Sequence, residues 1–154
     1  MLKPIQTKTL RSDGGNFAIV ASRYNSRYVD AMLRAAKTEL LRAGGNVQVV
    51  RVPGAYEIPV VVARLARKSR VSAVICLGVI LRGQTVHAAH IGDAVSDALM
   101  RIQVETEIPV IHEVLLLENE EQAKARCLGK THNRGREAAQ TAIAMTRVLK
   151  SLPE

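Results

Sequence analysis

Four short apolar runs, rich in β-branched residues, recur along the chain, and each has the length and composition of a buried strand. They are FAIVA from Phe17, VQVVRV from Val47, AVICLGVIL from Ala73 and PVIHEVLLL from Pro109. Because these runs are largely apolar rather than alternating with polar residues, we expect helices to cover both faces of the predicted sheet.

The segments between these runs show apolar residues at the three-to-four-residue spacing of an amphipathic helix. One such pattern follows Ser26 and stops at Gly44-Gly45, where glycine favours the end of a helix. A second pattern extends from Ile91 to Ile102, just after two histidines. Further helices are predicted over residues 59–65, 120–126 and 136–149.

Strands that alternate with helices predict a parallel sheet joined by right-handed crossovers. We therefore expect an α/β protein: a three-layer α/β/α sandwich around a four-stranded parallel sheet with flavodoxin-like topology. A chain of 154 residues is expected to form a single domain over residues 1–154. In such sheets ligands bind beyond the carboxyl ends of the strands, so a site is expected in the loops that follow the four runs.

Composition narrows the class of partner. The formal net charge of +8 favours acidic partners such as phosphorylated metabolites. The basic residues are spread along the chain and form no nucleic-acid-binding arm, so no nucleic-acid partner is expected. Only 3% of the residues are aromatic, and Trp is absent. The core should therefore be aliphatic, and any Tyr near a site becomes a stronger candidate for a role in that site.

The cysteines, the first residues and the length of the apolar runs indicate the cellular compartment of the protein. Cys76 and Cys127 are far apart and belong to no CxxC motif, so neither a disulfide framework nor a metal site is expected. The first 16 residues contain no apolar signal-peptide stretch, and no apolar run is long enough to span a bilayer. We expect a cytoplasmic protein with no membrane segment.

The loop LRGQTVHAAH, residues 81–90, follows the third run and carries the most suggestive chemistry. Gly83 allows a tight turn, and the N-terminus of the next helix favours an anion. Thr85 either donates to that anion or caps the helix. His87 has a side chain suited to proton exchange near neutral pH, whereas His90 has the weaker claim. The alternative is a solvated connection between a strand and a helix.

Two other strand ends offer rings and a carboxylate. In VPGAYEIP, residues 52–59, Glu57 can accept hydrogen bonds and Tyr56 can offer a flat face to a ligand. The alternative is that this segment is only a Pro-Gly turn before a helix. In SRYN, residues 22–25, Tyr24 is either a stacking platform or a ring that covers the core.

A basic segment, residues 125–139, places Arg126, Lys130, Arg134 and Arg136 around Gly and Asn residues. Arginine can hold a phosphate bidentately, and such a charge-assisted bond contributes roughly 1.5–3 kcal/mol. The alternative is a solvated basic loop.

Taken together, these segments resemble the lumazine synthase family of riboflavin biosynthesis. The resemblance covers about residues 17–149 and rests on five motifs in order. They are RYN at 23–25, VPGAYEIP at 52–59, GVILRGQTVH at 78–87, EEQAKAR ending at Arg126, and Lys130 followed by Asn133 and Gly135.

The resemblance implies condensation of 5-amino-6-(D-ribitylamino)uracil with 3,4-dihydroxy-2-butanone 4-phosphate. The products would be 6,7-dimethyl-8-ribityllumazine, phosphate and water, with no metal or organic cofactor. It assigns proton transfer to His87. It assigns the aminouracil to Tyr24, Ala55, Tyr56, Glu57, Val79, Ile80, Leu81 and His112. It assigns the phosphate to Gln84, Thr85 and Arg126, with Lys130 and Arg134 as accessory residues.

The resemblance further implies a homopentamer, which in this family extends to paired pentamers or icosahedral sixty-subunit shells, with sites between subunits. His112 would then reach a neighbour's site, residues 1–16 would pair with a neighbour's sheet, and riboflavin synthase is a candidate partner. Two departures stand out: His112-Glu113 replaces an aromatic residue followed by Gly, and Ala88-Ala89 replaces an aromatic and an acidic residue. A weakly active or non-catalytic shell protein that binds a flavin or lumazine is therefore the alternative.

Overall fold

The computed structural model describes residues 14–154, and its centre is a sheet of four parallel strands in the order β2-β1-β3-β4. The strands are β1 (Asn16–Ser22), β2 (Asn46–Val52), β3 (Ala73–Leu81) and β4 (Val110–Leu117). All four predicted strands are confirmed, and their ends differ from the expected ones by at most one residue. The predicted α/β class is likewise confirmed.

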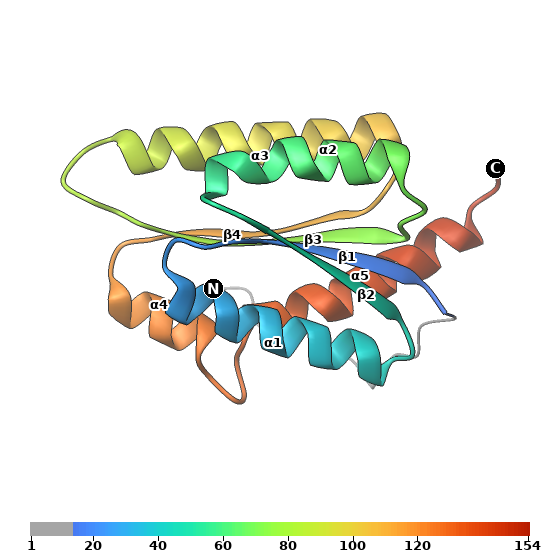
Figure 1. Ribbon diagram of the computed structural model, residues 1–154, viewed down its shortest axis with the longest axis horizontal. Coiled ribbons are helices and arrows are strands. Elements are labelled where there is room, and N and C mark those ends of the chain that lie inside the picture. Colours follow the sequence, from blue (N-terminus) through green and yellow to red (C-terminus); the bar gives the residue numbers. More distant parts are fainter. Residues whose placement is uncertain (1–13) are drawn as a thin grey trace.

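Helices cover both faces of this sheet, as expected from its apolar strands (Figure 1). One layer contains α2 (Ile58–Lys68) and α3 (His87–Thr106). The other contains α1 (Ser26–Arg42), α4 (Glu120–Cys127) and α5 (Arg134–Ser151). A short 3-10 helix, η1 (Ala55–Glu57), precedes α2.

Helix α5 begins two residues earlier than the apolar spacing predicts. The cause is Asn133, whose side-chain Oδ1 accepts hydrogen bonds from the backbone N–H groups of Gly135 at 2.8 Å and Arg136 at 3.3 Å. A side chain that satisfies these first-turn donors extends the helix to Arg134. Asn133 is a residue type that favours the N-cap position, but the spacing of apolar residues gives no information on polar residues at the start of a helix.

Neighbouring strand residues pack on opposite faces of the sheet and build two apolar clusters. Ile19 packs with Met32 of α1 and Ile143 of α5, whereas Val20 packs on the α2 and α3 side with Leu99. All are essentially inaccessible to solvent. Each large aliphatic side chain buried in this way contributes about 1.5–3 kcal/mol, which explains how a chain so poor in aromatic residues forms a stable core.

The expected pairing of residues 1–16 with a neighbouring subunit falls mostly outside the described residues. Of that segment, only residues 14–16 are described. Asn16 belongs to β1 of its own chain and is paired with Asn46 of β2.

Helices α1 and α5 pack closely at Gly135. A Cβ atom placed there would overlap the backbone of Met32, chiefly its carbonyl oxygen. The glycine is needed for this close approach of two helices rather than for an unusual backbone angle.

A buried carboxylate links β4 to the start of α5. Glu113 is 8% exposed, and its Oε2 accepts a hydrogen bond from Arg134 Nε at 3.1 Å. Arg134 also donates through Nη1 to Glu137 Oε2 at 3.0 Å. Burial raises the pKa of Glu113 from 4.5 to about 7, although the Arg134 guanidinium opposes the shift.

We expect Gly135→Ala to lower the free energy of unfolding by roughly 1–3 kcal/mol, because the methyl group would force α1 and α5 apart. Urea unfolding measures the change. Gly92→Ala in α3 is the control, since its Cβ would meet Leu116 at an ordinary 3.7 Å. Equal stability of the two variants would contradict the close packing at Gly135.

The Glu113 carboxyl should make stability depend on pH. Its pKa is higher in the folded chain, so its stabilising contribution is complete below the unfolded pKa of 4.5 and is lost as the pH rises through about 7. Between pH 5 and pH 8, the free energy of unfolding should fall less in Glu113→Gln than in the wild type. Glu118→Gln, which removes an exposed partner of Arg82, is the control and should retain the wild-type dependence.

Candidate active site

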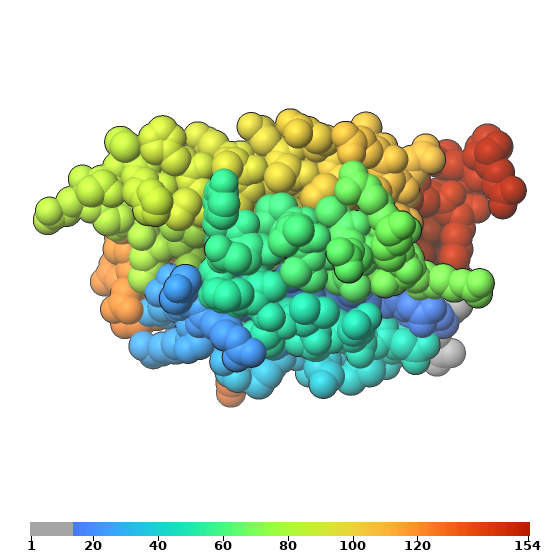
Figure 2. Space-filling view, turned by 45° about the horizontal axis from the view of Figure 1, so that its top comes forward, coloured from blue at the N-terminus to red at the C-terminus, as the bar shows by residue number. Residues whose placement is uncertain are grey.

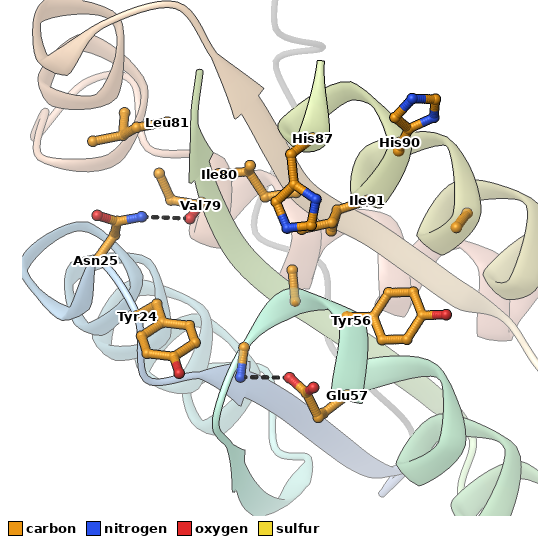
Figure 3. Close-up of a pocket in the computed structure, with 13 residues that line it drawn as sticks. Tyr24, Asn25, Tyr56, Glu57, Val79, Ile80, Leu81, His87, His90 and Ile91 are labelled. Carbon is orange, nitrogen blue, oxygen red and sulfur yellow. Dashed lines mark hydrogen bonds between the residues drawn. The ribbon is translucent and has the colours of Figure 1, made fainter. Parts of the chain in front are cut away.

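A pocket of about 830 Å³ lies at the carboxyl ends of β1, β2 and β3, where the strand-following loops meet the start of α3 (Figure 3). Eight of the predicted site residues line it. They are Tyr24, Ala55, Tyr56, Glu57, Val79, Ile80, Leu81 and His87. These residues come from three segments far apart in the sequence, so the carboxyl ends of β1, β2 and β3 meet at one pocket, whereas no residue of β4 lines it.

The turn after β1 places Tyr24 in the pocket. Asn25 adopts a left-handed backbone conformation with φ of 56°, which asparagine tolerates better than most residues. Its side-chain Nδ2 donates to the carbonyl oxygen of Val79 at 2.7 Å. The backbone N–H of Tyr24 donates to the carbonyl of Pro53 at 3.2 Å. The turn is thus tied to the loop after β2 and to the end of strand β3.

The loop after β2 is stabilised by a hydrogen bond to the carboxylate of Glu57, which belongs to the same loop. Glu57 Oε2 accepts a hydrogen bond from the backbone N–H of Gly54 at 2.9 Å, which leaves Oε1 for a ligand. A Cβ at Gly54 would lie 2.9 Å from two carbon atoms of the Tyr24 ring. Glycine at this position therefore allows the Tyr24 ring to pack against the loop.

Helix α3 starts at the pocket with His87. Val86 occupies the N-cap position and provides no side-chain hydrogen bond, so the suggestion that Thr85 is the N-cap residue is wrong by one position. Thr85 Oγ1 still accepts a long hydrogen bond, 3.4 Å, from the His87 backbone N–H. An uncapped N-terminus of a 20-residue helix leaves donors for an anion.

The two histidines occupy different positions at this site. In Figure 3 the His87 ring extends over the pocket, whereas the His90 ring lies one turn further along α3 and points away from Tyr24. Both residues line the pocket. From the sequence, His90 has the weaker claim of the two histidines. No role is predicted for Asn25 or Gly54, although they belong to the RYN and VPGAYEIP motifs.

The proposed phosphate ligands do not line the pocket of their own chain. Gln84 and Thr85 are exposed in the loop between β3 and α3, which projects from one end of the molecule (Figures 1 and 2). Arg126 lies on α4. Lys130 lines a separate groove between α1 and the α4–α5 connection, and Arg134 is engaged by two carboxylates.

His112 also lies away from this pocket, in the middle of β4. Its Nδ1 accepts a hydrogen bond from the Val114 backbone N–H at 3.1 Å, so Nε2 carries the proton and donates to Ser96 Oγ at 2.8 Å. Partial burial lowers the pKa of His112, against a smaller opposing contribution from the residue's own backbone. These contacts favour a neutral ring.

The arrangement suits the binding of a flat polar ligand. Apolar side chains of Val79, Ile80 and Ile91 and the ring of Tyr24 provide surfaces, while Glu57 can accept hydrogen bonds and His87 can exchange a proton. Over residues 14–154, no cluster of three or more His, Cys, Asp or Glu side chains is arranged to hold a metal ion. In the same range, no helix is both long and apolar enough to cross a membrane.

Comparison with known proteins identifies the family. Residues 14–150 match the family model described as 6,7-dimethyl-8-ribityllumazine synthase. A protein of that name from Stenotrophomonas maltophilia (strain R551-3) is 40% identical over 144 residues, which cover 92% of this chain and 93% of the relative. One from Xanthomonas oryzae pv. oryzae (strain PXO99A) is 39% identical over 147 residues, covering 94% and 96%. The fold, the five motifs and these matches together show that the chain belongs to the 6,7-dimethyl-8-ribityllumazine synthase family.

Proposed function

We propose that this protein condenses 5-amino-6-(D-ribitylamino)uracil with 3,4-dihydroxy-2-butanone 4-phosphate to form 6,7-dimethyl-8-ribityllumazine, phosphate and water. Family membership supports this reaction. The observation that carries it is the convergence of Tyr24, Glu57 and His87 on one pocket. Lumazine formation from the two purified substrates, followed by absorbance, tests the proposal directly.

The aminouracil would occupy the pocket between the β1 and β2 loops. Tyr24 and Tyr56 are 69% and 65% exposed, which leaves their rings free to pack against a ligand. Glu57 Oε1 would accept hydrogen bonds from the substrate, and Ala55 lies beside it. The backbone of Val79, Ile80 and Leu81 would meet the pyrimidine edge, although the Val79 carbonyl already accepts from Asn25.

The phosphate would lie at the N-terminus of α3. Gln84 and Thr85 precede this helix end and supply polar side chains, and the helix dipole favours the negative charge. Arg126 would complete this subsite from a neighbouring subunit, with Lys130 and Arg134 as accessory cations. Arg134 would first have to loosen its contacts with Glu113 and Glu137.

His87 would transfer protons during imine formation and loss of phosphate. An amine that condenses with a ketone needs orientation and proton transfer more than a strong nucleophile. A pocket that holds both substrates beside one imidazole therefore meets the requirements of the reaction without a cofactor.

We propose a homopentamer, the unit from which paired pentamers or sixty-subunit shells would be built. Support comes from large apolar side chains that are exposed in the single chain. Val60, Val86, Met100 and Val104 are each more than half exposed, and all lie on α2, on α3 or directly before α3. The position of His112 outside its own pocket further supports a site shared between subunits, to which His112 would contribute from the adjacent chain.

We also infer that the reaction takes place in the cytoplasm, and that riboflavin synthase receives the product. Cys76 and Cys127 are free and buried, in agreement with a reducing compartment. Burial raises the pKa of Cys127 to about 11, so its thiol remains protonated and unreactive.

His87→Ala should reduce kcat by roughly 100-fold or more, the usual contribution of a proton-transferring side chain. His90→Ala should change it by only a few-fold, because that ring points away from Tyr24. Steady-state rates of lumazine formation measure both. Equal losses in the two variants would refute the role given to His87.

Subunits that carry different defects should complement each other if the site is shared. Co-refolded His87→Ala and Arg126→Gln subunits should recover up to about a quarter of wild-type activity, because random mixing in a cyclic assembly places intact His87 beside intact Arg126 at that fraction of interfaces. Sedimentation before and after mixing confirms assembly. Activity no higher than the mean of the two separate variants would argue against a shared site.

A further inference from the structure

Arg51 links three elements: β2, β1 and α1. It is the last residue but one of β2, and its side chain reaches across the sheet to the end of β1 and to α1. Nη2 donates to the carbonyl oxygen of Ser22 at 3.0 Å. Nη1 lies 2.7 Å from Asp30 Oδ1, an ion pair between β2 and the second turn of α1.

These contacts flank the turn that carries Tyr24. Ser22 is the last residue of β1 and Asp30 follows the start of α1, so the turn of residues 23–25 lies between the two points that Arg51 holds. The turn is also bonded to β2, because the backbone N–H of Arg23 donates to the Val52 carbonyl at 2.9 Å. The backbone alone therefore ties the turn to β2, and the Arg51 side chain adds the link to α1.

The environment of Arg51 shows that this arrangement has a cost. Its side chain is 23% exposed. Its Nε and the Asp30 Oδ1 atom with which Arg51 forms the ion pair are both buried without a hydrogen-bond partner among the described residues, so the contact with Asp30 is an ion pair and not a hydrogen bond. An unsatisfied buried donor is destabilising, and a partly buried ion pair contributes little net stability. Stability alone is thus a weak reason for an arginine here, whereas its planar fork is suited to holding two acceptors at a fixed angle.

We infer that Arg51, oriented by Asp30, is a positioning residue for the aminouracil subsite: it fixes the β1–α1 turn so that Tyr24 is held ready to stack on the ring. The inference rests on the proposed function and assigns Arg51 no contact with substrate. It predicts an effect on one substrate only, because Gln84, Thr85 and Arg126 of the phosphate subsite lie on other elements.

The test compares Arg51→Met with Arg67→Met in the purified full-length protein. Arg67 forms a 3.0 Å ion pair with Glu105 between α2 and α3, so the control also breaks an ion pair between two elements. The measurements are KM for each substrate, kcat, the Kd of 6,7-dimethyl-8-ribityllumazine from its fluorescence, and the unfolding midpoint.

Arg51→Met should raise the KM for the aminouracil and the Kd of the lumazine on the order of tenfold, equivalent to about 1.4 kcal/mol. The KM for the phosphate-bearing substrate should stay within about twofold. Arg67→Met should leave all of these values unchanged. Arg51→Lys should give an intermediate effect, since an ammonium can pair with Asp30 but lacks the fork that also reaches Ser22.

Unchanged affinities in Arg51→Met, or equal losses for both substrates, would overturn the inference. If Arg51→Met does not fold, Asp30→Asn and Arg51→Lys decide instead: a selective rise in the aminouracil KM supports the role, and wild-type values in both reject it. A wild-type protein that neither forms nor binds lumazine would refute the proposed function itself, which is a separate outcome.

Discussion

The site depends on the parallel pairing of β1 with both of its neighbours. β1 is hydrogen-bonded to β2 on one side and to β3 on the other, and all three run in the same direction. Their carboxyl ends therefore lie at the same edge of the sheet, and the loops that follow them lie next to one another. Reversing any of these strands would send its loop to the opposite end of the molecule, and the pocket would lose one of its walls.

Short polar contacts then convert three neighbouring loops into a defined pocket. Asn25 bonds to the Val79 carbonyl, Glu57 holds the Gly54 amide, and backbone groups of the first turn bond to the loop after β2. Each contact satisfies a backbone group that would otherwise need water, so the loops are ordered before a ligand arrives. A pocket organised in this way loses less conformational entropy on binding.

Charged side chains are engaged at both edge strands of the sheet, on the face that α1, α4 and α5 cover. Around β4, the carboxylate of Glu113 engages Arg134, a cation that a phosphate would otherwise attract. On β2, Arg51 donates to a carbonyl oxygen of β1 and pairs with a carboxylate of α1, and among the described residues no Lys or Arg side chain lines the pocket. The positive charge suited to phosphate therefore lies outside the pocket of the single chain, on Arg126, Lys130 and Arg134.

The sequence by itself predicts the strands, the helices and a candidate site at the carboxyl ends of the strands, because apolar periodicity and glycine stops are local signals that survive in a parallel fold. It also singled out Tyr24, Glu57 and His87 through short motifs. The tertiary structure alone decided that Asn25 bonds to a residue 54 positions away, that Glu113 occupies Arg134, and that Arg51 holds the Tyr24 turn. These contacts depend on strand register and on the directions of side chains from separate elements, and neither quantity is encoded in the spacing of residues along one segment.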